Sequence, residues 1–356
     1  MDPRWRQLGD LLVDWSVELK PGEKVMIAMG EVDSLPLARA VHEAVIRAGG
    51  YPQVQFLSES LRHQLLKYGS EEQISRVPDI EAYGMEWADV YIGLRGASNL
   101  HEHDEISAER LSSNQRAMGR ISTLRWEKTR WCLVRVPNAL FAQQAETDDE
   151  TITEMFFKAS LLDWKAESAR WQAWARRLNR GSRVRIVGTG TDLSFSVAGR
   201  TWQAADGRIN MPDGEIMTAP IEDSVDGEIY FDLPGVLSGR LVHDIRLRFE
   251  GGSLVEARSS TNQDFLTRVL ATDAGARIVG EFAMGTNMAV DRFCKDILFD
   301  EKIGGTIHLA MGRSYPACGG RNASAIHWDI VKDIRRDGRV LVDEVPVLEN
   351  GKFLLE

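Results

Sequence analysis

The residues whose types could do chemistry together gather in the last third of the chain. His327 and Asp329 flank Trp328 in an otherwise apolar segment. Residues two apart on a β-strand share a face, so this imidazole and this carboxylate would point into one site. Their spacing alone leaves two interpretations open, a pair of metal ligands or a hydrogen-bonded core pair. His308 lies in a second strand-like run, within residues 306–312.

Two glutamates strengthen the metal interpretation. Glu215 follows a turn-forming stretch at 210–214, and Glu281 lies in the apolar segment 278–283. A buried carboxylate without a partner is energetically costly. Two cations about 3.5–4 Å apart that share a bridging carboxylate would satisfy several such groups at once. The sequence therefore suggests a dinuclear metal site as a hypothesis.

Other polar motifs are weaker candidates. The segment 101–104, His-Glu-His-Asp, holds four possible ligands, but nothing nearby completes a coordination sphere, so we predict a solvated loop. Cys318 precedes two glycines and has no activating neighbour in the sequence, which favours a plain loop thiol. The Gly-Thr-Gly-Thr run at 188–191 precedes another strand-like segment, whereas a phosphate-binding loop needs a following helix.

The first half of the chain reads as alternating helices and strands, an order that predicts a parallel sheet covered by helices. We predict helices at 7–18, 35–48, 79–87 and 105–125, and strands at 25–29, 54–57, 89–94 and 131–136.

A helical segment at 150–179 carries an apolar stripe, which we interpret as packing against the core or a domain interface. Short strands and turns dominate after it, with a hairpin turn expected at Gly251-Gly252. We therefore expect an N-terminal α/β domain over 1–181. A C-terminal α+β domain rich in antiparallel strands, over 182–356, would carry the chemistry.

Composition excludes some partners. Asp and Glu number 53 against 43 Lys and Arg, which gives a net charge of −10. Such a balance disfavours nucleic acid and anionic membranes as partners. The three scattered cysteines fit a reducing compartment, and no apolar run approaches the length of a membrane span. We expect a cytoplasmic protein.

Four stretches in the second half, in this order, resemble the aminopeptidase T / aminopeptidase S family of dinuclear metallo-aminopeptidases. They are NMPDGEIMTAP at 210–220, GEFAMGTN at 280–287, DEKIGGTIHLAMGRSYP at 300–316 and NASAIHWD at 322–329. The N-terminal half is similar to the family in its general layout, a Rossmann-like α/β domain.

The resemblance implies a set of site residues. The family's metal-ligand positions correspond to Glu215, Glu281, His308, His327 and Asp329, with Glu281 as the bridge between two ions. Tyr315 matches the family's catalytic tyrosine, and Glu301 corresponds to a further acidic residue of the site. The implied activity is hydrolysis of N-terminal residues from peptides by a water that two divalent ions activate. Zinc, cobalt and manganese all suit these ligands. The resemblance also implies peptide substrates with a free N-terminus and a homodimer.

Two alternatives stay open. His308, His327 and Asp329 would also make the two-histidine, one-carboxylate triad of a non-haem Fe(II) enzyme, such as a ring-cleaving dioxygenase of the dihydroxypyridine type. A single-iron site has less need of Glu215 and Glu281, so these residues favour the hydrolase. A non-catalytic scaffold or binding protein is disfavoured because all five ligand positions are intact.

Overall fold

The computed structural model describes residues 2–355, which form two compact units. The first unit comprises Met1–Leu161 with Gly207–Pro212, and the second comprises Leu162–Asp206 with Asp213–Glu356. The division falls at Leu161, so the helix at 164–178 belongs to the second unit, whereas our expected boundary lay near residue 181. Among the residues described, no helix combines the length and hydrophobicity needed to cross a bilayer.

The first unit is built on a parallel five-stranded sheet of order β2-β1-β3-β4-β8. Its strands are β1 (Lys24–Gly30), β2 (Tyr51–Leu57), β3 (Val90–Arg95), β4 (Arg130–Arg135) and β8 (Asn210–Met211). The central strands β1 and β3 are almost continuously buried, as expected for a parallel sheet covered on both faces. The predicted parallel sheet is confirmed.

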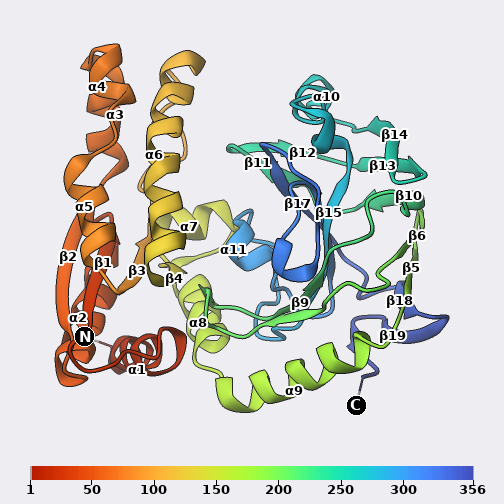
Figure 1. Ribbon diagram of the computed structural model, residues 1–356, viewed down its shortest axis with the longest axis horizontal. Coiled ribbons are helices and arrows are strands. Elements are labelled where there is room, and N and C mark those ends of the chain that lie inside the picture. The colour runs from red at the N-terminus through yellow and green to blue at the C-terminus, as the bar shows by residue number, and fades with distance from the viewer. Residues whose placement is uncertain (1, 356) are drawn as a thin grey trace. The chain divides into compact units, whose positions relative to one another are not determined.

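The helices of this unit are drawn from red to yellow-green in Figure 1. They are α1 (Pro3–Leu11), α2 (Leu35–Arg47), α3 (Glu59–Tyr68), α4 (Glu71–Ser75), α5 (Asp79–Trp87), α6 (Ala108–Lys128), α7 (Ala139–Gln144) and α8 (Asp149–Ser160). Helix α1 packs against α2, and α6 packs against α4 and α5. A π-helical turn at Leu12–Ser16 extends α1 over most of the helix predicted at 7–18.

The second unit is dominated by two antiparallel sheets. The larger has the order β14-β13-β10-β6-β5-β18-β19-β20 and the smaller β17-β16-β15-β9-β7. The strands of the larger sheet are β5 (Arg183–Gly188), β6 (Thr191–Ser196), β10 (Asp226–Phe231), β13 (Ile245–Glu250), β14 (Ser253–Arg258), β18 (Arg339–Val342), β19 (Val345–Glu349) and β20 (Lys352–Phe353). Those of the smaller sheet are β7 (Gln203–Ala205), β9 (Glu215–Thr218), β15 (Val279–Gly285), β16 (Ile307–Gly312) and β17 (His327–Lys332). The predicted antiparallel character of this region is confirmed.

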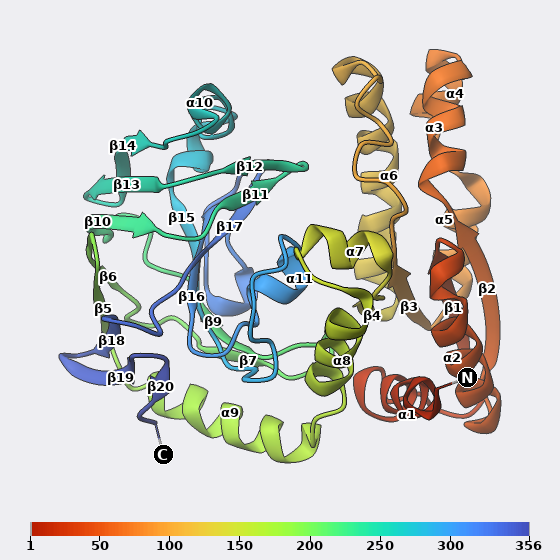
Figure 2. The same cartoon turned by 180° about the vertical axis from the view of Figure 1, so that it is seen from behind.

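Aromatic side chains join the two sheets of this unit. Phe195 on β6 packs edge-to-face on Phe282 of β15, with ring centroids 5.2 Å apart. Helix α9 (Trp164–Leu178) lies along β7 and β9, as both views show (Figures 1 and 2). The remaining elements are the hairpin β11 (Gly235–Leu237) and β12 (Arg240–Val242), and the helices α10 (Gln263–Val269) and α11 (Ile297–Asp300). The aromatic contact between Phe195 and Phe282 therefore packs one face of the smaller sheet against the larger sheet.

The segment predicted as one helical stretch at 150–179 is two helices, α8 and α9. The break lies at residues 161–163, where the Asp163 carboxylate accepts a hydrogen bond from the backbone N–H of Ala166 and caps α9. Trp164, Trp171 and Leu178 of the apolar stripe are buried in α9, which confirms their packing role.

Candidate metal centre

One face of the smaller sheet collects the candidate ligands from four adjacent strands. Glu215 begins β9, Glu281 lies on β15, His308 on β16, and both His327 and Asp329 on β17. Strand registry places each of them opposite a small residue: Gly285 pairs with Glu215, Ala283 with His308, Ala310 with both Glu281 and Asp329, and Gly312 with His327. Because alternate residues share a face, all the charged side chains project to one side and small neighbours leave them room.

The intervening residues of the same strands point to the opposite face. Phe282 and Met284 on β15, Leu309 on β16, and Trp328 and Ile330 on β17 are all almost fully buried. This apolar layer fixes the strands, so the five ligand positions on the strands do not depend on loops, whereas Glu301 lies in the turn after α11. The sheet therefore acts as a rigid support for a polar site.

The imidazoles and carboxylates converge closely. His308 Nε2 lies 3.3 Å from Glu215 Oε2 and 3.7 Å from Glu281 Oε1. His327 Nε2 lies 3.2 Å from Glu281 Oε2 and 3.4 Å from Asp329 Oδ1. Glu281 thus lies between the two imidazoles and presents one oxygen to each. The shared strand face that we predicted for His327 and Asp329 is present.

A backbone contact orients the His327 ring. Its Nδ1 lies 2.7 Å from the carbonyl oxygen of Arg313, so Nδ1 carries the proton and donates it there. This contact directs Nε2 toward Glu281 and Asp329. Hydrogen bonds of this kind on the outer ring nitrogen commonly orient histidines that bind metals.

A buried lysine, which our sequence analysis did not single out, lies within the cluster. Lys302 Nζ is 2.6 Å from Glu215 Oε1, 2.8 Å from Glu301 Oε1 and 3.1 Å from Asp213 Oδ1. Lys302 is 0% exposed, and Asp213 is equally buried. The only sequence signal was a lysine beside Glu301 in a segment otherwise free of charge at 302–312.

The charges of the centre shift the pKa values of its members. Burial, with further contributions from Glu301 and Glu281, raises the pKa of Glu215 to about 8 although Lys302 opposes this shift. Burial also raises the pKa of Glu301. For Asp329 the burial effect is outweighed by His327, which brings its pKa to about 2. For His308, burial is likewise outweighed by Glu281 and Glu215, and its pKa is about 9.

Several buried polar atoms of the centre have ion-pair contacts at most and form no hydrogen bond within residues 2–355, namely Glu215 Oε2, Asp329 Oδ1 and both ring nitrogens of His308. Buried polar atoms are normally paired, so these point to a missing partner. Two groups of ligand atoms, Glu215–Glu301–His308 and Glu281–His308–Asp329, each lie within 4.8 Å of one another. Five carboxylates surround a single lysine and two imidazoles here, so a divalent cation fits the chemistry of this donor set.

Tyr315 borders the centre at the start of a short 3₁₀ turn. Its ring centroid lies 5.0 Å from that of His327, and the residue remains 36% exposed. Partial burial and the negative charges of Glu281 and Asp329 raise its pKa above the ordinary value. The phenol is therefore protonated at neutral pH and available as a donor.

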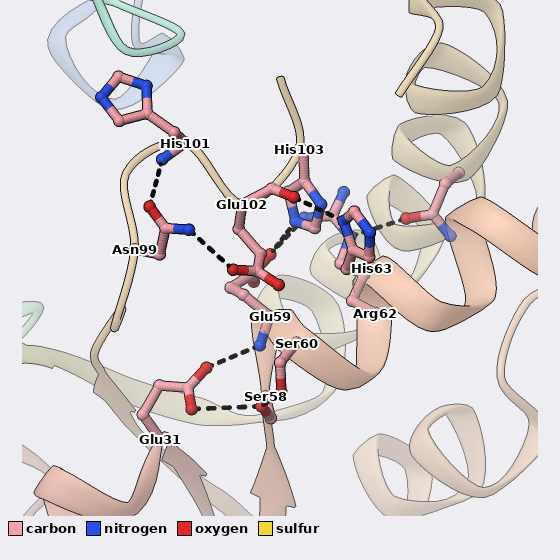
Figure 3. Close-up of polar contacts among 11 residues, drawn as sticks. Glu31, Ser58, Glu59, Ser60, Arg62, His63, Asn99, His101, Glu102 and His103 are labelled. Atoms are coloured by element: carbon pink, nitrogen blue, oxygen red, sulfur yellow. Dashed lines mark hydrogen bonds and ion pairs between the residues drawn. The ribbon is translucent and has the colours of Figure 1, made fainter. Parts of the chain in front are cut away.

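The weaker motifs have structural roles. Residues 101–104 form a turn, as predicted, in which His101 pairs with Asp104 and its ring points away from His103 (Figure 3). His103 instead contacts Glu59 at 2.7 Å. Cys318 is a buried thiol whose pKa burial raises to about 12, so it is not activated. Gly188 and Thr191 face each other in the β5–β6 hairpin, and no helix follows.

The centre combines buried histidines and carboxylates on an antiparallel sheet, in a chain that also contains a parallel α/β unit, and its donor set is that of a metal-dependent protein. Comparison with known families identifies which class of metal-dependent protein this is. Residues 1–353 match the family described as thermophilic metalloprotease (M29), and the chain belongs to that family. The resemblance found in the sequence is thereby confirmed.

Individual relatives agree with this assignment. The chain is 28% identical to aminopeptidase T of Thermus thermophilus over 348 residues, which cover 87% of this chain and 84% of the relative. Its structure is similar to that of AmpT from the same organism, with a TM-score of 0.87, 25% identity and 99% of each chain covered. A 2,5-dihydroxypyridine dioxygenase from Pseudomonas putida matches with a TM-score of 0.65 over 98% of this chain and 96% of that one. At 15% identity, this second likeness shows the fold alone.

Proposed function

We propose that this protein is a metallo-aminopeptidase that removes N-terminal residues from peptides at a centre of two divalent ions. The observation that supports this most directly is the pair of ligand groups that share His308, Glu215–Glu301–His308 and Glu281–His308–Asp329. Membership of a metalloprotease family and similarity to aminopeptidase T support the reaction class.

The two groups suggest how the ligands would be shared. Glu215 and Glu301 would hold one ion, and Asp329 and His327 the other, with His308 beside both. Glu281 is our choice for the bridging carboxylate, because its two oxygens face different imidazoles at 3.7 and 3.2 Å. Lys302 holds Oε1 of both Glu215 and Glu301, and their second oxygens would then serve as ligands.

Divalent ions such as zinc, cobalt or manganese lower the pKa of water and polarise a carbonyl when bound at such a site. Tyr315 keeps its proton and would donate a hydrogen bond to the oxyanion that develops on the scissile carbonyl. The excess of carboxylates would attract the protonated α-amine of a peptide. That attraction favours action at a free N-terminus over cleavage within a chain.

We further propose a cytoplasmic homodimer. The three cysteines are buried free thiols, which suits a reducing compartment. The edge strand β2 exposes apolar side chains, with Tyr51 63%, Val54 47% and Phe56 44% exposed. An exposed apolar strand edge is prone to pair with another chain, so a second copy is a suitable cover.

The test combines metal analysis with hydrolysis of leucyl-p-nitroanilide. We expect two divalent ions per chain and release of leucine. Glu281→Gln should lose both bound metal and turnover, whereas Glu349→Gln, an exposed glutamate on β19, should keep both. One iron per chain with oxygen uptake would instead support the dioxygenase alternative. Metal-free protein without turnover would support a scaffold.

A further inference from the structure

The first unit contains a cavity of about 360 Å³ that extends over one face of its parallel sheet and reaches the carboxyl ends of β1 and β3. Its walls include Gly30 at the end of β1 and Leu94 and Arg95 at the end of β3. Because β2 lies on one side of β1 and β3 on the other, the strand order reverses between β1 and β3. Open α/β sheets characteristically bind ligands at such a switch point. The cavity also falls within the usual size range of small-molecule sites, about 300–1,000 Å³.

Arg125, on α6, lines this cavity and is 9% exposed. Its Nε is buried without a hydrogen-bond partner, and its guanidinium makes no ion pair with any residue from 2 to 355. The group packs over the rings of Trp131 and Tyr91, 4.5 and 5.7 Å from their centroids. Buried arginines are normally paired with an anion, because an unpaired buried charge is costly.

A second arginine adds to the positive charge of this wall. Arg95 lines the same cavity and is exposed. Burial lowers the pKa of Arg125, and the charge of Arg95 lowers it further. An anionic group between the two guanidiniums would compensate the buried charge of Arg125 and offset its repulsion by Arg95. A carboxylate matches the forked geometry of arginine.

The cavity also carries an acidic group without a partner. Glu81, on α5, is half-buried in the cavity wall and forms no hydrogen bond or ion pair within the described chain. Burial raises the pKa of its carboxyl. A cationic group of a ligand would compensate that carboxylate.

Two more glutamates at the rim are already satisfied, as Figure 3 shows. Glu31 accepts hydrogen bonds from the backbone N–H of Glu59 at 2.7 Å and from Ser58 Oγ at 3.2 Å. Glu59 is in turn paired with Arg62 and His103. With three glutamates and two arginines in its walls, the cavity disfavours a multiply charged anion such as phosphate and suits a ligand that carries both charges.

We propose that this cavity binds a small zwitterion with an ammonium and a carboxylate, namely a free amino acid or a dipeptide. Arg125 and Arg95 would bind the carboxylate and Glu81 the ammonium. The side chains of Met85, Met118 and Ile121 provide an apolar wall for the body of the ligand. This inference uses only the first unit and does not depend on the proposed function.

Isothermal titration calorimetry with L-leucine tests the proposal. The full-length Glu281→Gln protein is titrated, so that the metal centre of the second unit does not contribute. We expect one saturable binding event per chain. Adding Arg125→Gln should weaken it at least tenfold, and adding Arg125→Lys should weaken it less. Adding Arg116→Gln, an exposed arginine on the same helix, should leave it unchanged.

The chemical class is tested with the same protein. N-acetyl-leucine and leucinamide each lack one charge, and both should bind at least tenfold more weakly than leucine. Glu81→Gln should weaken binding of leucine but not of N-acetyl-leucine. No saturable binding of leucine, equal binding with Arg125→Gln, or equal binding of N-acetyl-leucine or inorganic phosphate would each overturn the proposal. Circular dichroism that shows a folded Arg125→Lys protein keeps the comparison valid if Arg125→Gln does not fold.

Discussion

At the scale of single residues, Lys302 is the most informative feature of the centre. It is a fully buried cation that contacts three buried or nearly buried carboxylates, Asp213, Glu215 and Glu301. Removing one partner of a buried ionic cluster leaves an uncompensated charge, which costs far more than losing a surface ion pair. Lys302 therefore stabilises the acidic centre whether or not metal is bound.

Lys302→Met keeps most of the side-chain volume and removes the charge. In the presence of a chelator, we expect it to lower the free energy of unfolding by about 3–5 kcal/mol. Urea denaturation followed by circular dichroism measures this change. Lys352→Met, at an exposed lysine, is the matched control and should change stability by less than about 0.5 kcal/mol. An equal, small effect in both variants would show that Lys302 is not needed for charge balance.

Tyr315 is the residue whose role is most directly chemical. If it donates a hydrogen bond to the oxyanion, Tyr315→Phe should lower kcat about 10²–10³-fold while the metal content per chain stays unchanged. Steady-state hydrolysis of leucyl-p-nitroanilide and metal analysis on the same sample provide both readouts. Tyr230→Phe removes a phenol that donates instead to Asp244, and its rate should match the parent protein. An unchanged rate for Tyr315→Phe would remove this residue from the mechanism.

At the scale of elements, the two faces of the smaller sheet in the second unit have different roles. Leu309 and Ala310 are neighbours on β16, but Leu309 faces the apolar core and Ala310 faces the ligands, opposite Glu281 and Asp329. A substitution on the apolar face should therefore affect stability, and a substitution on the ligand face should affect the metal site.

We expect Leu309→Ala to lower the free energy of unfolding by about 2–5 kcal/mol and to leave the metal content of the folded protein intact. Ala310→Leu should affect the metal site more than the stability, because a larger side chain would occupy the space between Glu281 and Asp329. Its metal content should fall well below that of the parent. Denaturation curves and metal analysis on both variants check this, and a similar loss of metal in the two would contradict the two-face assignment.

The sequence predicted regular elements well where periodicity was strong. Helix 79–87 agrees with α5, and the strand expected at 25–29 lies within β1. The short strands β7, β8 and β9 were missed because two to four residues carry no recognisable period. The break between α8 and α9 was missed because the apolar stripe continues across residues 161–163.

The site was predictable to the extent that ligands lie two apart on one strand, as His327 and Asp329 do. The meeting of four strands is a long-range feature that spacing cannot supply, and the family resemblance supplied it instead. Neither route indicated Lys302 or Asp213, because their roles depend on the fold that brings Glu301 against Glu215.

At the scale of the whole molecule, the exposed apolar residues on β2 bear on assembly. Val54 and Phe56 are two apart on this edge strand, so both point to the same side of the sheet. Lysine on an edge strand blocks pairing because burying its charge in an interface is unfavourable. If β2 forms part of a dimer contact, the double variant Val54→Lys/Phe56→Lys should be a monomer, whereas the parent should have the mass of two chains. Size-exclusion chromatography with light scattering measures both masses.

Val345→Lys replaces an equally exposed valine in the second unit and should remain dimeric. A double variant that keeps the parent's dimeric mass would place the contact elsewhere, and a monomeric parent would refute the dimer itself.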